Sequence, residues 1–264
     1  MAEIERAIER YDDGGVRRLT LNRPARRNAL NLALLKALRA ELATARADAT
    51  VRCLVLTGAG PGFCAGADVK EWSETAASGD VEGGGWIAEA HALIGALHAF
   101  PRPTVAVIRG AAAGAGVDLA LACDFRIAAD DARFICAYTR MAYPPDMGGT
   151  WLLPRVIGIE AAKRFAFTGA AWTAEEALAR GLVGEVHPVD RVLELASAFA
   201  AQLAMGPTVA QMHAKRLIDG AMTRSLAEQL VLEKAAGDAC AKSDDAAEAM
   251  RAAVEKRAPR FTGR

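Results

Sequence analysis

The chain has 264 residues, of which 52% are hydrophobic, and its 32 basic side chains balance its 32 acidic ones. A formal net charge of zero gives no basic surface for nucleic acid or anionic membrane, and 24% charged residues beside this apolar content exclude a disordered chain. We therefore expect a compact cytoplasmic protein that binds neither nucleic acid nor membrane and that has one large domain, with or without a helical appendage.

The cysteines indicate the same compartment. The chain has five cysteines, which is an odd number, and no two of them form a CxxC pair. They are Cys53, Cys64, Cys123, Cys136 and Cys240. This pattern predicts buried free thiols in a reducing compartment, not a disulfide or zinc framework. The charged start of the chain, MAEIERAIERYDD, has no apolar segment of the kind found in a secretory signal.

Four short apolar runs with strand character occur at 16–21, 53–57, 104–108 and 125–129. Between the first two runs, residues 29–45 carry a leucine at every fourth position, which predicts a helix. This alternation favours an α/β fold in which helices cover buried strands.

The strand signals stop after about residue 190, and helices are predicted at 190–204, 207–220 and 225–256. We therefore divide the chain into an α/β core over residues 1–200 and a helical region over residues 201–264.

Three glycine-rich turns carry the strongest chemical signal. They lie at 58–68 (GAGPGFCAGAD), 110–118 (GAAAGAGVD) and 144–150 (PPDMGGT), and the second and third lead into predicted helices. Small residues let backbone N–H groups approach a ligand closely, and the first N–H groups of a helix have no partner within the helix. Two such turns directed at one carbonyl oxygen would form an oxyanion hole.

Other glycine-based functions fit poorly. The glycines at 58 and 60 and those at 114 and 116 lack the third small residue of a dinucleotide fingerprint. The chain has no GxxxxGK[ST] phosphate loop and no GxSxG nucleophile elbow. The four histidines are scattered and no third ligand stands at metal spacing, so no metal site is predicted.

Two aspartates lie within these small-residue turns, Asp118 and Asp146. Partial burial would raise the pKa of either carboxyl and make it a usable proton carrier. Structural roles are equally open: Asp146 could cap the following helix, and Asp118 could be a first-turn carboxylate favoured by the helix dipole.

Six segments together resemble the crotonase superfamily, the enoyl-CoA hydratases and isomerases. They occur in register at 23–30 (RPARRNAL), 63–70 (FCAGADVK), 110–124, 145–150 (PDMGGT), 168–183 and 254–263 (VEKRAPRFTG). The resemblance implies an α/β spiral of ββα turns with a C-terminal helical region that forms homotrimers, or dimers of trimers. It also implies an acyl-CoA thioester substrate and no separate cofactor, because coenzyme A is part of that substrate.

The resemblance assigns the thioester oxygen to the backbone N–H groups of Ala67 and Ala115, although the second position is usually glycine. It places the adenine of CoA near the backbone of Ala65 and its phosphates near Lys70. Three further basic residues are weaker candidates for the phosphates and could equally be solvated surface side chains: Arg26, Arg27 and Lys256, the last from this chain or a neighbouring subunit. The acyl pocket is expected from 72–90 and 138–143, with Trp72, Trp86, Tyr138 and Tyr143.

Hydratases of this superfamily use two glutamates, and the corresponding positions here are Asp118 and Tyr138. A phenol, with a reference pKa of about 10, is a poor substitute for a carboxylate that handles the proton of water. Asp146 stands where several isomerases have an aspartate, and residues 145–155 are similar to the isomerases of phenylacetate breakdown. Dienoyl-CoA isomerases also carry both aspartates, but with a glutamate in place of Tyr138.

These features predict a double-bond isomerase of acyl-CoA with Asp146 as its proton carrier. Two alternatives stay open: a hydratase that uses Asp118 and Asp146 around a water molecule, and a non-catalytic acyl-CoA-binding relative.

Overall fold

The computed structural model describes residues 7–77 and 85–264. The strands are β1 (Ile8–Asp13), β2 (Val16–Leu21), β3 (Cys53–Gly58), β4 (Thr104–Ile108), β5 (Ala111–Ala113), β6 (Phe125–Ala129), β7 (Arg133–Ile135), β8 (Ala171–Thr173) and β9 (Glu185–His187). The helices are α1 (Leu32–Ala47), α2 (Val69–Ala77), α3 (Trp86–His98), α4 (Ala115–Leu121), α5 (Gly149–Ile157), α6 (Ile159–Thr168), α7 (Ala174–Ala179), α8 (Val192–Met205), α9 (Thr208–Ala221), α10 (Leu226–Cys240) and α11 (Asp244–Val254), with short 3-10 helices η1 (Pro24–Arg26) and η2 (Thr139–Met141).

The larger sheet has the strand order β1-β2-β3-β4-β6-β9. It is parallel from β2 to β9, and β1 pairs antiparallel with β2. Every residue of β3 and β4 is buried, which explains their continuous apolar sequences. The four predicted strands are confirmed as β2, β3, β4 and β6.

The sequence pattern does not predict the other strands, for two physical reasons. Only Ile8 of β1 is buried, so this edge strand has no alternation of apolar and polar residues. Strands β5, β7, β8 and β9 have three residues each, too few to establish a period.

A smaller sheet with the order β5-β7-β8 forms a second layer. Isolated parallel bridges join Leu30 to Ala67 and Cys64 to Ala112, so the segments after β2 and β3 continue this layer. Each turn of the chain therefore passes from a long strand of the first layer to a short strand or bridge of the second. This is the α/β spiral that the resemblance implies, and it stacks the glycine-rich turns beside one another.

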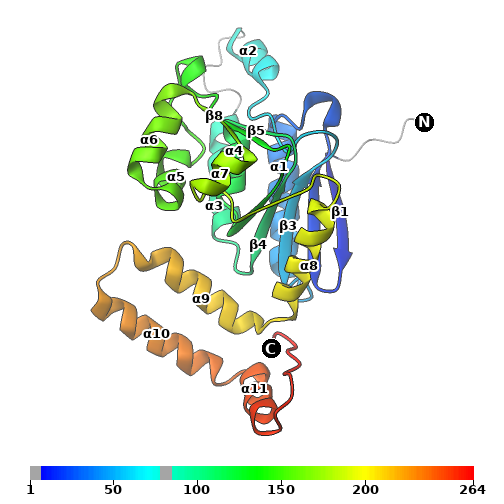
Figure 1. The fold of residues 1–264 in the computed structure, drawn as a ribbon, viewed down its shortest axis with the longest axis vertical. Coiled ribbons are helices and arrows are strands. Elements are labelled where there is room, and N and C mark those ends of the chain that lie inside the picture. The colour runs from blue at the N-terminus through cyan, green and yellow to red at the C-terminus, as the bar shows by residue number, and fades with distance from the viewer. Residues whose placement is uncertain (1–6, 78–84) are drawn as a thin grey trace, which may run out of the picture.

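Helices cover both faces of the larger sheet (Figure 1). The buried leucines of α1 pack with β2, α3 and the second layer in the main core. Along β3, the alternate residues Cys53 and Val55 face a second core, formed with Val192 and three alanines of α8. The predicted division at residue 200 thus falls inside α8, and the packing of that helix places it with the sheet.

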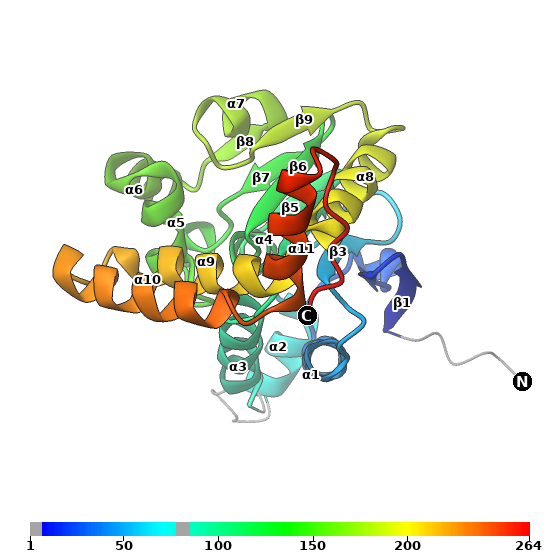
Figure 2. The same ribbon diagram turned by 90° about the horizontal axis from the view of Figure 1, so that it is seen from below.

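The C-terminal helices project from this body. Figures 1 and 2 show α9 and α10 side by side as a hairpin away from the strands, with α11 at its base. The prediction of one helix over 225–256 is wrong, because the chain breaks between Cys240 and Asp244. The Ser243 side chain accepts a hydrogen bond from the Ala246 N–H at 3.1 Å and so begins a new helix.

The environment of the cysteines matches the expectation with one exception. All five are unpaired in the structure, four of them buried, but Cys240 is partly exposed, so the prediction of a buried thiol is wrong there. Across residues 7–77 and 85–264, no single helix is long and apolar enough to cross a membrane. Helices α8 and α9 are long and apolar enough only when taken together, and the chain bends by 104° between them.

A buried carboxylate holds the C-terminal segment in place. Asp245 is 3% exposed and accepts hydrogen bonds from the Thr262 N–H at 2.6 Å and the Gly263 N–H at 2.9 Å. We expect Asp245→Ala to lower the free energy of unfolding by about 1–3 kcal/mol, since two backbone N–H groups lose a buried, charged acceptor. Urea unfolding measures this, with Asp244→Ala, an exposed neighbour in the same helical turn, as control. Equal unfolding midpoints for the two variants contradict the assignment.

Candidate active site

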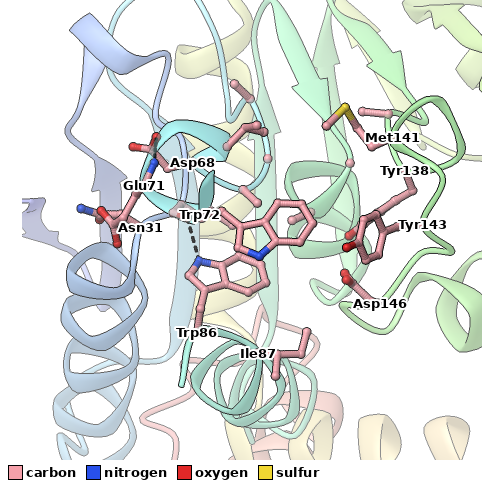
Figure 3. Close-up of a pocket in the computed structure, with 18 residues that line it drawn as sticks. Asn31, Asp68, Glu71, Trp72, Trp86, Ile87, Tyr138, Met141, Tyr143 and Asp146 are labelled. Carbon is pink, nitrogen blue, oxygen red and sulfur yellow. Dashed lines mark hydrogen bonds between the residues drawn. The ribbon is translucent and has the colours of Figure 1, made fainter. Parts of the chain in front are cut away.

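The stacked turns of the second layer enclose a cavity of about 370 Å³ (Figure 3). Its walls come from the turn before α2, the start of α4, helices α2 and α3, and the segment around η2. The lining residues are Leu30, Asn31, Ala65, Gly66, Ala67, Asp68, Val69, Glu71, Trp72, Trp86, Ile87, Gly114, Ala115, Ala137, Tyr138, Met141, Tyr143 and Asp146.

Ala67 and Ala115 both lie in this cavity. The Leu30 N–H donates to the Gly66 carbonyl at 2.7 Å, and the Leu30 carbonyl accepts from the Asp68 N–H at 3.1 Å. The N–H of Ala67, between these two residues, takes part in neither hydrogen bond. Ala115 is the first residue of α4, so its N–H has no acceptor within the helix. In the part of the chain that the structure describes, neither N–H donates to another carbonyl, and both can serve a ligand oxygen.

Glycines let the two donor turns touch. Gly66 has a φ of +90°, and a Cβ built there would lie 2.7 Å from the carbonyl oxygen of Ala113. A Cβ at Gly116 would lie 2.4 Å from the carbonyl oxygen of Cys64. These approaches are closer than a side chain allows, so glycine at both positions sets the distance between the two N–H groups.

Asp118 lies behind the cavity wall and is 3% exposed. The Tyr138 hydroxyl donates to its Oδ2 at 2.5 Å, and a Cβ at Gly149 would lie only 2.2 Å from its Oδ1. Burial raises the pKa of Asp118 to about 7, although hydrogen bonds from Tyr138 and from the backbone of Met147 and Gly149 act to lower it. Asp118 is a first-turn residue of α4, but its contacts reach well beyond that helix.

Asp146 lines the cavity directly, on the loop before α5. Partial burial raises its pKa above the ordinary aspartate value, while hydrogen bonding to its own backbone, the charge of His91 and the Tyr138 hydroxyl act to lower it. The Nε2 atom of His91 lies 2.7 Å from the carbonyl oxygen of Asp146 and so holds the loop against α3. The helix-capping interpretation of Asp146 is wrong, because Gly148 is the N-cap of α5 and no side chain caps it.

Trp72 and Trp86 form an aromatic wall opposite Asp146 (Figure 3). Trp72 and Tyr143 meet edge to face with ring centroids 4.9 Å apart, and the Trp86 Nε1–H donates to the Leu30 carbonyl at 2.8 Å. Figure 3 shows both tryptophans facing Asp146 across the cavity. The expected pocket segment 72–90 therefore contributes through α2 and α3, while its residues 78–84 lie outside the described chain. Met141 and Ile87, which lie within the expected segments, also line the pocket, whereas Asn31 and Glu71 line it without having been predicted.

The predicted CoA-binding residues are only partly brought together. Ala65 lies in the cavity wall, and its N–H donates to the carbonyl of Arg27 at 2.9 Å. The side chains of Arg26, Arg27 and Lys70 are exposed outside the cavity, and Lys70 lies 3.9 Å from Glu74. Lys256 follows α11 at the end of the molecule opposite α2 (Figure 1), so this subunit does not place it near Ala65.

Comparison with known proteins assigns the chain to a family. A family model described as enoyl-CoA hydratase/isomerase matches residues 12–264, and the chain belongs to this family, which is part of the crotonase superfamily. The 1,2-epoxyphenylacetyl-CoA isomerase of Escherichia coli is 38% identical over 95% of this chain and 96% of its own length.

Solved structures support the same fold. A Pseudomonas aeruginosa structure is 51% identical, with a TM-score of 0.84 over 89% of this chain and 99% of its own. The enoyl-CoA hydratase of Bacillus anthracis is 36% identical, with a TM-score of 0.92 over 98% of this chain and 100% of its own. The relatives thus include both isomerases and hydratases, and the family alone does not choose the reaction.

Proposed function

We propose that this protein is an acyl-CoA double-bond isomerase. The observation that carries the proposal is the position of Asp146, a carboxyl of raised pKa in the same cavity as the N–H groups of Ala67 and Ala115. The other carboxyls of the cavity, Asp68 and Glu71, lie on the far wall in Figure 3. Asp68 pairs with Arg23 at 3.0 Å, and Glu71 accepts from the N–H at the start of α1.

In this mechanism Asp146 takes a proton from the carbon between the thioester carbonyl and the double bond. The C–H electrons move toward the thioester oxygen, which gains charge and is held by the N–H groups of Ala67 and Ala115. Asp146 then returns the proton to the far carbon of the conjugated system. One carboxyl suffices, because isomerisation adds neither water nor a net proton.

The hydratase alternative needs Asp118 to activate water together with Asp146. The contacts of Asp118 disfavour this, since the Tyr138 hydroxyl and two backbone N–H groups already surround its carboxylate. A non-catalytic role in acyl-CoA binding is disfavoured by the position of Asp146, whose carboxyl lines the same cavity as the N–H groups of Ala67 and Ala115.

The substrate is an acyl-CoA thioester with an apolar acyl group, and coenzyme A enters as part of it. The aromatic wall supports the acyl assignment, and the position of Ala65 beside Arg27 supports a CoA route past that turn. Exposed apolar residues of the C-terminal helices, including Ile218, Met222 and Val231, support homotrimers or dimers of trimers. We assign the enzyme to the cytoplasm because its cysteines are unpaired.

An absorbance assay with 3-enoyl-, 3,5-dienoyl- and 2-enoyl-CoA tests the reaction. We expect the conjugated-enoyl signal to grow with 3-enoyl-CoA and to persist with 2-enoyl-CoA. Rapid loss of the 2-enoyl signal identifies a hydratase instead. Binding of all three thioesters without any spectral change identifies a non-catalytic protein.

A further inference from the structure

The loop that carries Asp146 has few hydrogen bonds of its own. It spans residues 142–148, between η2 and α5. Pro144 and Pro145 have no backbone N–H to donate. Within the described residues, no hydrogen bond between backbone groups involves residues 144–147. The conformation of this stretch therefore depends on contacts with side chains from other parts of the molecule.

Buried contacts fix the loop on the C-terminal side of Asp146. Met147 is fully buried in the main core. Gly149 lies against Asp118, since a Cβ built there would be 2.2 Å from the Oδ1 atom of that aspartate. On the other side of Asp146, residues 141–144 are exposed. Asp146 thus lies at the boundary between a fixed and an exposed part of the loop.

His91 holds the Asp146 peptide itself. Its Nε2 atom lies 2.7 Å from the carbonyl oxygen of Asp146. A carbonyl oxygen only accepts hydrogen bonds, so Nε2 must carry the hydrogen. His91 belongs to α3, which packs along α1 and buries Leu93 and Leu97 completely. The hydrogen bond therefore ties the loop to a helix that the core holds in place.

A second hollow adjoins the loop and gives Asp146 room to move. It has a volume of about 450 Å³ and lies between α3 and the start of α5, with walls that include Ile94, His98 and Trp151. Asp146 lines both this hollow and the catalytic cavity, whereas His91 lines only the hollow. Because Asp146 borders two open spaces, packing alone does not decide which of them its side chain enters.

We propose that His91 is a positioning residue that keeps the carboxyl of Asp146 in the catalytic cavity. Its bond to the carbonyl oxygen fixes the orientation of the peptide group, and with it the direction in which the Asp146 side chain leaves the backbone. Proton transfer needs the carboxyl within reach of the substrate, and a displacement of about 1 Å lowers the rate by about a hundredfold. This inference rests on the proposed function, which makes Asp146 the proton carrier.

The test compares substitutions of His91 in 3-enoyl-CoA isomerisation. His91→Ala should lower kcat by about tenfold to a hundredfold. KM should change little, because His91 does not line the catalytic cavity. His91→Gln should restore most of the rate, since its amide nitrogen can take the place of Nε2 and donate to the same carbonyl. His91→Asn should not, because its shorter side chain places the amide nitrogen where Nδ1 was.

His98→Ala is the matched control. It removes an imidazole two turns further along α3, where the ring meets Trp151 edge to face with centroids 5.3 Å apart and does not contact the Asp146 peptide. We expect its kcat and KM to equal those of the wild type. A His91→Gln enzyme as slow as His91→Ala overturns the proposal, because the hydrogen-bond donor then has no effect on the rate.

A crystal structure of His91→Ala gives a readout that does not depend on activity. We expect the backbone of residues 144–147 to be displaced toward the hollow relative to the wild type. A loop that superimposes on that of the wild type overturns the proposal. If the enzyme hydrates 2-enoyl-CoA, or converts none of the thioesters, the proposed function fails, yet the position of this loop still decides the role of His91.

Discussion

Asp146→Asn is expected to lower kcat for 3-enoyl-CoA isomerisation by about a hundredfold to ten-thousandfold. The amide has the shape of the carboxylate but cannot accept a proton near neutral pH, so the reaction loses its base while the cavity stays intact. KM should change little, because binding of the thioester does not depend on the proton transfer. Steady-state kinetics on the 3-enoyl substrate measures both constants.

Asp219→Asn is the matched control for this prediction. Burial also raises the pKa of Asp219, but this residue lines a different cavity, beside Lys215 on α9. A loss of activity confined to Asp146→Asn assigns the effect to the base itself. Near-normal turnover of Asp146→Asn means that another group carries the proton, and Asp118 becomes the first candidate.

The strands that organise the site were predictable, because burial leaves a strong local signal. β3 and β4 are covered on both faces, and their apolar runs identify them without other information. The short strands that complete the second layer give no such signal, since β5 and β7 owe their existence to neighbours that come from elsewhere in the chain. The spiral therefore followed from family resemblance and not from periodicity.

The two aspartates were predictable as a chemical type, because a carboxylate among glycines and alanines is expected to lose water. The hydrogen bond from Tyr138 to Asp118 was not predictable. Tyr138 and Asp118 are 20 positions apart, and no local spacing relates a residue after β7 to one in α4. Their contact depends on how the second layer stacks, which is a property of the whole fold.

A role for particular basic residues in binding CoA was the least predictable feature. Lys70, Arg26 and Arg27 carry exposed side chains, and nothing in their local sequence distinguishes a phosphate ligand from a solvated charge. Lys256 lies far from Ala65 within one subunit, so a role for it depends on a neighbouring copy, which a single-chain pattern does not encode.

The second large effect is expected from Gly66→Ala, which tests the backbone donors that side-chain mutagenesis cannot reach. The new Cβ would meet the Ala113 carbonyl oxygen at 2.7 Å and the Ala115 nitrogen at 3.5 Å, and the φ of +90° disfavours any L side chain. The two turns must separate, and the N–H groups of Ala67 and Ala115, which we propose as donors to one oxygen, then move apart. Loss of one such donor lowers kcat by about a hundredfold to a thousandfold.

The strain also lowers the free energy of unfolding, by about 1–3 kcal/mol, so rate and stability must be measured on the same samples. Gly62→Ala is the matched control in the same loop, because its Cβ would have its nearest neighbours at 3.6 Å and its φ is outside the left-handed region. An enolate gains more from the donors than the ground-state thioester does, so kcat should fall in Gly66→Ala with little change in KM. A folded Gly66→Ala enzyme with the kcat of Gly62→Ala contradicts the oxyanion hole, because the thioester oxygen must then be stabilised by groups other than these two turns.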